Sequence, residues 1–221
     1  MLFGVCVDSQ DQRPMVSIKW PETDEVPSPP LNDKGRPRWP HAHQAKVTFL
    51  DTEFLGWEKN ANLFTEIAIW HLESLLPQVW KIRPAPLDLA RAMDTPYAEA
   101  NIRKAMELNG YNEKEWADAP LWVDVRMDIA REIFGRILCG NNVWDADILR
   151  LKNGLYPRDT QWIRPTHLEL QDMAKIAGHK KTSLDALCKA YGIEEETVHR
   201  AEGGVRRVRE VARRMLGVGS D

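Results

Sequence analysis

The sequence predicts a mixed α/β fold in which a five-stranded sheet is flanked by helices. Residues 46–84 contain three short apolar segments rich in β-branched and aromatic residues, which is typical of strands joined as a meander. After residue 86 the apolar residues instead recur three and four positions apart, as they do on one face of a helix. Strand-like stretches interrupt these helical segments, so the chain is expected to run from strands to helix, strand, helix, strand and final helices.

The composition is ordinary for a globular protein and gives no global attraction to nucleic acid. Of 221 residues, 43% are apolar and 29% are charged, and the formal net charge is −3. Binding to nucleic acid would therefore depend on a local basic patch. The three cysteines, Cys6, Cys139 and Cys188, show neither metal-ligand spacing nor a disulfide framework, which favours the reducing cytoplasm. Because no apolar run suits a transmembrane helix and the start lacks a signal-peptide pattern, we expect a cytoplasmic protein without a membrane partner.

The first 45 residues are expected to form an extension, and residues 46–217 the main domain. Two short strands are expected within residues 2–7 and 15–20, because apolar residues dominate the first segment and alternate with polar ones in the second. The stretch that follows, up to residue 43, is rich in proline and charge and nearly lacks aliphatic residues, which favours an extended linker. A solvated tether is the simplest interpretation, and the extension also leaves room for a protein partner.

The most informative stretch is residues 46–57, KVTFLDTEFLGW. Its apolar run predicts a strand, and this strand ends at two carboxylates one residue apart, Asp51 and Glu53. Alternate side chains of a strand point to the same face, so the two carboxylates would lie side by side. Two hard oxygen ligands at that spacing suit Mg²⁺ or Mn²⁺. The alternative is a strand that ends in an ordinary polar turn.

The next segments supply two more strands and the first helices. Strands are expected over residues 64–72 and 79–82, and the first of these is mostly apolar, as a buried strand would be. The spacing of apolar residues predicts helices over residues 87–95, 98–110 and 123–138.

Residues 139–154, CGNNVWDADILRLKNG, form a second distinctive stretch. A Gly-Asn-Asn turn is expected shortly before Asp145, and Asp145 would open a helix carrying Ile148, Leu149 and Leu151. The helix dipole favours an aspartate in the first turn, so Asp145 could be no more than a helix-terminal charge.

The C-terminal third is expected to contain one strand and three helices. The strand lies within residues 162–168, the first helix within 170–177, and the second between its Ser183 cap and Gly192. The last helix has a buried apolar stripe, with five arginines mostly off that stripe. These arginines form either a solvated face or a phosphate-facing patch. They are Arg206, Arg207, Arg209, Arg213 and Arg214.

Three short motifs occur in order along the chain. FLDTEFLG contains Asp51 and Glu53, and HRAEGGVRRV contains His199 and Ala201. Between them, GNNVWDADIL has four matching residues, Asn141, Trp144, Asp145 and Leu149. Together the motifs resemble those of the DEDDh exonuclease family, the group of the bacterial proofreading subunit and ribonuclease T. The second motif of that family is Asn-x-x-Phe-Asp-x-x-x-Leu, and the third is His-x-Ala-x-x-Asp.

The resemblance covers about residues 46–216 and implies a ribonuclease H-like fold. It also implies a 3′–5′ exonuclease that hydrolyses phosphodiester bonds at single-stranded DNA or RNA ends with two divalent cations, Mg²⁺ or Mn²⁺. In that scheme Asp51 bridges both ions, Glu53 helps to hold one and Asp145 supports the other. His199 takes the proton of the attacking water.

The same resemblance suggests which residues meet the nucleic acid. Phe54 and Leu55 directly follow the carboxylates and could press on the terminal base, with burial in the core as the alternative. Asn141 and Trp144 of the second motif are also expected to contact the nucleic acid.

The chain departs from the family at the fourth acidic residue, which falls at Gly204. Because glycine has no side chain for a metal ion, we expect low activity that is better with Mn²⁺ than with Mg²⁺, and Gly204→Asp should raise the Mg²⁺-dependent rate. Glu202 could serve as a metal ligand instead only if Gly203-Gly204 broke the helix. Two functions follow, an active exonuclease and a nucleic-acid-binding or regulatory module on the same fold.

Overall fold

The computed structural model describes residues 4–7, 14–17, 46–56, 63–154, 163, 166–194 and 199–216. The chain divides into two compact units, residues 1–38 and 39–221. In the first unit, strands β1 (Gly4–Val7) and β2 (Pro14–Ser17) pair antiparallel, where two strands were expected. The linker expected after them, residues 21–43, lies outside the described residues.

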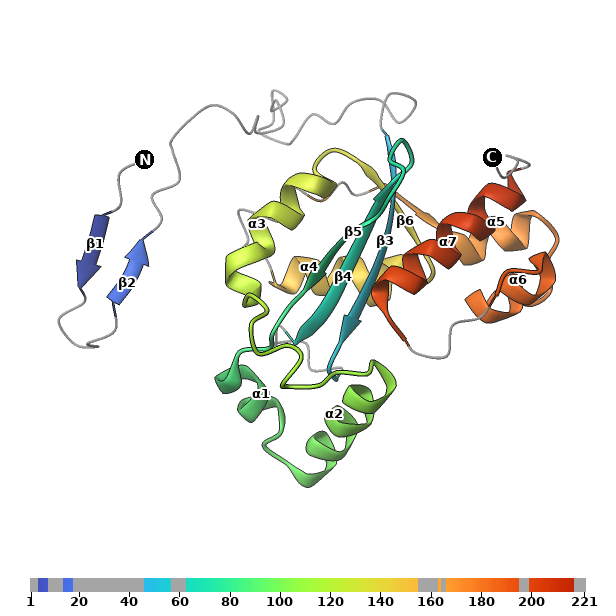
Figure 1. Ribbon diagram of the computed structural model, residues 1–221. Coiled ribbons are helices and arrows are strands. Elements are labelled where there is room, and N and C mark those ends of the chain that lie inside the picture. The colour runs from blue at the N-terminus through green and yellow to red at the C-terminus, as the bar shows by residue number, and fades with distance from the viewer. Residues whose placement is uncertain are drawn as a thin grey trace, which may run out of the picture. The chain divides into compact units, whose positions relative to one another are not determined.

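The described residues of the second unit contain a mixed five-stranded sheet, as predicted (Figure 1). Its order is β5-β4-β3-β6-β7, in which β3, β4 and β5 form an antiparallel meander and both β6 and β7 run parallel to their neighbours. The strands are β3 (Val47–Phe54), β4 (Phe64–His71), β5 (Gln78–Lys81), β6 (Ile137–Gly140) and β7 (His167–Glu169).

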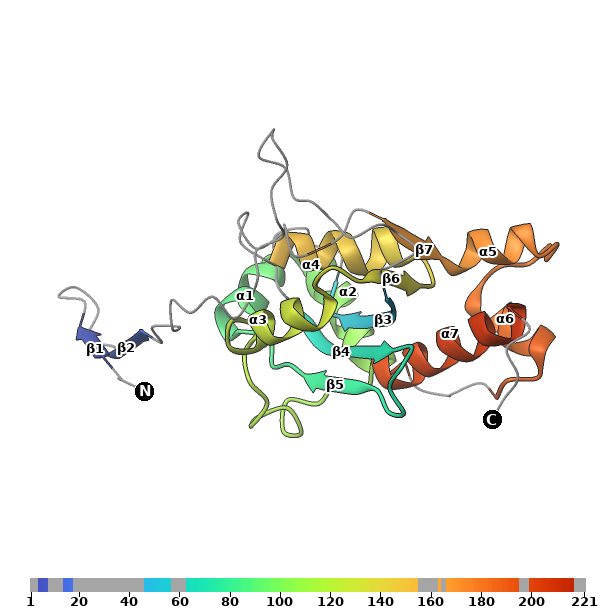
Figure 2. The same ribbon diagram turned by 90° about the horizontal axis from the view of Figure 1, so that it is seen from above.

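Helices cover both faces of the sheet. Adjacent residues of β3 point to opposite faces, so they pack against different groups of helices. Leu50 belongs to a core formed with α3, η2 and α4, whereas Phe49 belongs to a core formed with α5, α6 and α7. Seen from above, α5, α6 and α7 are grouped together (Figure 2). Asp51 and Glu53 share the face of Phe49, so they point toward the α7 side.

The helices of this unit are α1 (Pro86–Ala92), α2 (Pro96–Leu108), α3 (Trp122–Ile133), the π-helix η2 (Val143–Ile148), α4 (Leu149–Gly154), α5 (Leu170–Ile176), α6 (Leu184–Tyr191) and α7 (Ala201–Met215). No helix within the described part of the chain is long and apolar enough to cross a membrane.

Two predictions about residues 123–154 were wrong. The helix expected up to residue 138 ends at Ile133, since Gly135 adopts a left-handed backbone conformation (φ 68°) and the chain then enters strand β6. Helical and strand periodicity cannot be distinguished in so short a buried apolar run. Asp145 does not open a helix either, because η2 begins two residues earlier, directly after left-handed Asn142 (φ 59°).

Candidate active site

The candidate site lies at the carboxyl end of β3. β6 pairs with β3 only along Val47–Phe49, so the last residues of β3 extend beyond it. The chain leaves β6 at Gly140 and turns into η2, which lies next to this free part of β3. A Cβ at Gly140 would lie 2.9 Å from the carbonyl oxygen of Leu50, so the glycine permits the close approach of the two segments.

Three carboxylates of the two central strands interact at this end of the sheet. Asp51 and Glu53 lie on one face of β3, and Glu66 on β4 is the register partner of Glu53. Burial raises the pKa of Glu53 to about 7, and Glu66 adds to this effect while Arg207 and Arg200 oppose it. Burial also raises the pKa of Asp51 well above its usual range, and nearby Asp147 and Glu53 raise it further. The site therefore holds more negative charge than its buried surroundings favour.

Asp147 of η2 completes this cluster, and it takes the position expected for Asp145. Its side chain is buried and accepts a hydrogen bond of 2.6 Å from the Thr52 hydroxyl. Burial raises the pKa of Asp147 to about 8, against the lowering effect of that hydrogen bond. Asp145 is instead exposed and lines a separate cavity of about 310 Å³ together with Trp144. The structure therefore places Asp147, and not the expected Asp145, against β3, because the wide π-helical turn changes which residues face that strand.

Helix α7 packs against Asp51 through a glycine. A Cβ at Gly204 would lie 2.5 Å from Cγ of Asp51, so any side chain there would require the carboxylate to move. The helix remains regular at this point, since the Gly204 N–H donates to the Arg200 carbonyl oxygen at 2.9 Å. Glu202 is exposed and pairs with Arg206 at 3.2 Å. The helix break that would bring Glu202 to the site is therefore absent at Gly203-Gly204, and an aspartate at position 204 cannot be added without displacing Asp51.

Glu66 fixes the start of α7 to the sheet. This buried carboxylate accepts hydrogen bonds from the Arg200 guanidinium, at 3.0 and 3.2 Å, and from the Ala201 N–H, at 2.8 Å. A negative charge is favoured at the N-terminus of a helix. Glu66 was not predicted as a site residue, although a glutamate inside the mostly apolar segment FTEIAIW is a signal that could have identified it.

His199 lies two residues before α7 and is exposed. Its backbone N–H donates to the carbonyl oxygen of Leu108, at the end of α2, over 3.4 Å. The next residue, Arg200, places its guanidinium 4.9 Å from the centre of the Trp116 ring. Trp116 is itself buried and donates to the Thr65 carbonyl oxygen at 2.9 Å. These contacts hold the segment that carries His199 against both α2 and the sheet.

The two residues that follow the carboxylates have different surroundings. Leu55 is fully buried in a small core with Ile102, so it follows the core alternative and not the expected contact with a terminal base. Phe54 is partly buried, and the Arg150 guanidinium lies 3.3 Å from the centre of its ring. The aromatic ring and this cation therefore form one stacked pair beside the carboxylates.

The residues of the second motif lie in η2 and directly beside it. Trp144 stacks on His167 with 5.0 Å between the ring centres, and the Lys152 ammonium lies 4.6 Å from the Trp144 ring. The side-chain oxygen of Asn141 is buried and has no hydrogen-bond partner within the described part of the structure.

The donor chemistry of the site fits a hard divalent cation. Among the described residues, no three His, Cys, Asp or Glu side chains are close enough to hold a metal ion as they stand. Asp51, Glu53 and Asp147 nevertheless offer carboxylate oxygens, which are the ligands that Mg²⁺ and Mn²⁺ prefer. Their raised pKa values indicate mutual repulsion in a buried setting, which a bound cation would offset.

Solved structures of exonuclease I are similar to this chain. Escherichia coli exonuclease I with a dT13 oligonucleotide has a TM-score of 0.61 and 18% identity over 78% of this chain and 41% of that one. A product-bound exonuclease I has a TM-score of 0.60 and 18% identity, covering 78% and 43%. Exonuclease I from Methylocaldum szegediense has a TM-score of 0.61 and 17% identity, covering 76% and 40%. The fold is ribonuclease H-like, as predicted.

This similarity establishes the fold. The chain spans about two fifths of the length of these structures. No protein-family model and no curated protein sequence matches it.

Proposed function

We propose that the chain is a divalent-metal-dependent 3′–5′ exonuclease that acts on single-stranded nucleic acid. The observation that carries this proposal is the convergence of Asp51, Glu53 and Asp147 at the carboxyl end of β3. The fold similarity to exonuclease I supports the reaction class, and one of those structures contains a dT13 oligonucleotide.

The proposed roles follow from where each side chain lies. Asp51, Glu53 and Asp147 would hold the metal ions, which when bound stabilise the charge that develops during phosphodiester hydrolysis. His199 would accept the proton of the attacking water, as the third motif implies, because it is exposed and its segment is held at the start of α7. Glu66 positions His199 through its hydrogen bonds to Arg200 and Ala201.

Two partly exposed groups are proposed to contact the strand near its 3′ end. The Phe54 ring under the Arg150 guanidinium offers a stacking surface directly after the carboxylates. Trp144 of η2 offers a second aromatic surface. Neither contact selects DNA over RNA, so both are proposed as substrates.

A second candidate function is a nucleic-acid-binding or regulatory module without catalysis. It is favoured by Gly204, which has no side chain at the motif position of the fourth acidic residue, and by the Asp51 carboxylate packed against it. A protein of this kind would bind single strands but leave them intact.

A nuclease assay separates the two functions. A single strand labelled at its 5′ end is incubated with the protein in Mn²⁺, in Mg²⁺ and in EDTA. The exonuclease proposal predicts shortening in Mn²⁺, slower shortening in Mg²⁺ and none in EDTA, with Asp51→Asn inactive in all three. Intact strands under every condition, with retained binding, would assign the chain to the second function.

A further inference from the structure

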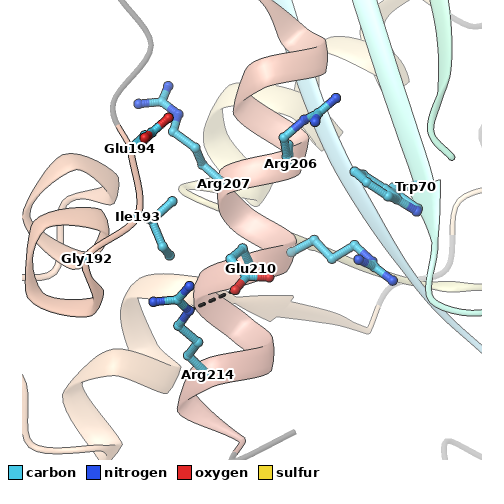
Figure 3. Close-up of a pocket in the computed structure, with 9 residues that line it drawn as sticks. Trp70, Gly192, Ile193, Glu194, Arg206, Arg207, Glu210 and Arg214 are labelled. Atoms are coloured by element: carbon cyan, nitrogen blue, oxygen red, sulfur yellow. Dashed lines mark hydrogen bonds and ion pairs between the residues drawn. The ribbon is translucent and has the colours of Figure 1, made fainter. Parts of the chain in front are cut away.

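Helix α7 forms one wall of a cavity of about 530 Å³ that we name the α7 pocket (Figure 3). Its described lining includes four arginines of α7 together with Trp70 of β4 and Glu194 after α6. These arginines are Arg206, Arg207, Arg209 and Arg214. In Figure 3, Arg207 and Arg214 extend toward the segment at Ile193, whereas Arg206 extends toward Trp70.

The α7 pocket is basic although the chain as a whole is not. Among its described lining residues, four arginines face two glutamates, Glu194 and Glu210, which leaves a formal charge of +2. The full chain has a net charge of −3. This local excess of guanidinium groups attracts a polyanion at close range.

Two of the arginines pair with exposed carboxylates that a phosphate could replace. Arg206 pairs with Glu202 at 3.2 Å, and both side chains are at least half exposed, at 57% and 50%. Arg207 pairs with Asp185 at 3.1 Å, where the aspartate side chain is 73% exposed and that of Arg207 is 11% exposed. Exposed ion pairs contribute little to stability. A phosphate oxygen can therefore compete with the carboxylate for the same guanidinium, in the bidentate geometry that arginine prefers.

Arg209 is held in place but lacks full charge compensation. Its guanidinium lies 4.5 Å from the centre of the Trp70 ring, and its buried Nε has no hydrogen-bond partner within the described structure. Burial lowers the pKa of Arg209, and neighbouring Arg213 lowers it further. An anion in the pocket would offset both effects, so Arg209 is an oriented cation that favours a negatively charged ligand.

The α7 pocket and a cavity beside the carboxylate site share Arg206 as a lining residue. This second cavity, of about 360 Å³, is also lined by Glu66, Arg200 and Glu202. Glu66 is the register partner of Glu53, so the second cavity borders the carboxylates. A strand whose 3′ end lies at the carboxylates can therefore continue along α7. An acidic peptide would not be placed along α7 in this way, because it is not bound at the carboxylates.

We propose that the α7 pocket binds backbone phosphates of single-stranded nucleic acid, as the part of the strand upstream of the 3′ end. The direction of the strand in this inference rests on the proposed function. The pocket itself rests on the geometry of Arg206, Arg209 and Trp70.

Binding of a fluorescent dT oligonucleotide to the full chain, measured by anisotropy in EDTA at several salt concentrations, tests the proposal. Each phosphate contact on a single strand contributes about 0.7 to the slope of log K against log salt. The double variant Arg206→Gln/Arg209→Gln should therefore bind more weakly, with a slope reduced by about 1.4. Arg206→Gln alone should reduce the slope by about 0.7, and this variant keeps the test valid if the double variant fails to fold.

Arg103→Gln is the matched control. Arg103 is exposed and pairs with Glu99 four residues away, as Arg206 does with Glu202, but it lies on α2. It should leave affinity and slope unchanged.

An unchanged slope in the α7 variants, or an equal reduction in Arg103→Gln, would overturn the proposal. A second result would also overturn it: polyglutamate binding that is lost in the Arg206→Gln/Arg209→Gln variant while oligonucleotide binding is kept. The pocket would then bind an acidic peptide. Binding is measured without metal and without hydrolysis. A lack of nuclease activity would therefore refute the proposed exonuclease function and leave the binding result for the α7 pocket unaffected.

Discussion

Replacing Asp147 with asparagine should stabilise the metal-free protein at neutral pH and abolish its activity. Burial raises the pKa of Asp147 from 3.8 to about 8 in the folded protein. Asparagine has nearly the same shape, can still accept the Thr52 hydrogen bond of 2.6 Å, and removes the ionisable group. The substitution thus isolates the effect of the carboxylate charge.

The sign and the size of the effect follow from linkage. Because the folded-state pKa is above the unfolded one, the contribution of Asp147 to stability is greatest below pH 3.8 and is lost as the pH rises toward 8. At 1.36 kcal/mol per pH unit, the loss between the unfolded pKa and pH 7 is roughly 4 kcal/mol. Asp147→Asn avoids this loss, so its free energy of unfolding should exceed that of wild type by roughly 2–4 kcal/mol at pH 7 and by little at pH 3.5.

Urea unfolding in EDTA at the two pH values measures this difference. Asp145→Asn is the control, since Asp145 is exposed and should change stability at neither pH. Equal stability changes in Asp147→Asn at both pH values, or a loss at pH 7, would refute the account of a buried, repelling carboxylate cluster.

Three further predictions concern the metal, the glycine and the extension. Mn²⁺ should raise the Tm of wild type by mass action on the folded state, and Asp51→Asn should remove most of that gain; an equal gain in the variant would exclude Asp51 as a ligand. Gly204→Ala should lower the free energy of unfolding by about 1–3 kcal/mol in urea titrations and reduce activity, because its Cβ would displace the Asp51 carboxylate. A wild-type-like alanine variant would show that this close approach is dispensable. A chain beginning at residue 42 should fold and keep its activity, because the composition of residues 1–45 cannot supply a core; insoluble or inactive protein would contradict this.

The parts of the site predicted from the sequence are those encoded by short-range periodicity. The period of two in a strand placed Asp51 and Glu53 on one face of β3, and the structure has them there. The period of 3.6 in the last helix identified the apolar stripe at Val205 and Val208, which is buried against the sheet. Both patterns depend only on local backbone geometry, so one sequence is enough to show them.

The parts that were missed depend on contacts between distant segments. Asp147 faces β3 because a left-handed residue and a π-helical turn set the register of η2, and neither follows from hydrophobic spacing. The buried charge of Glu66 is compensated by Arg200 and the Ala201 N–H, and Arg200 is 134 positions away in sequence. Gly204 was interpreted as a missing ligand, whereas the structure shows that the glycine lets α7 approach Asp51.

The most direct test of the central claim is the order in which a single strand is degraded. A 5′-labelled linear strand in Mn²⁺ should shorten one nucleotide at a time from its 3′ end, and a circular single strand of the same sequence should remain intact. Asp145→Asn should behave as wild type, and Asp147→Asn should leave both strands intact. Cleavage of the circle, or an active Asp147→Asn beside an inactive Asp145→Asn, would contradict the proposed site and its chemistry.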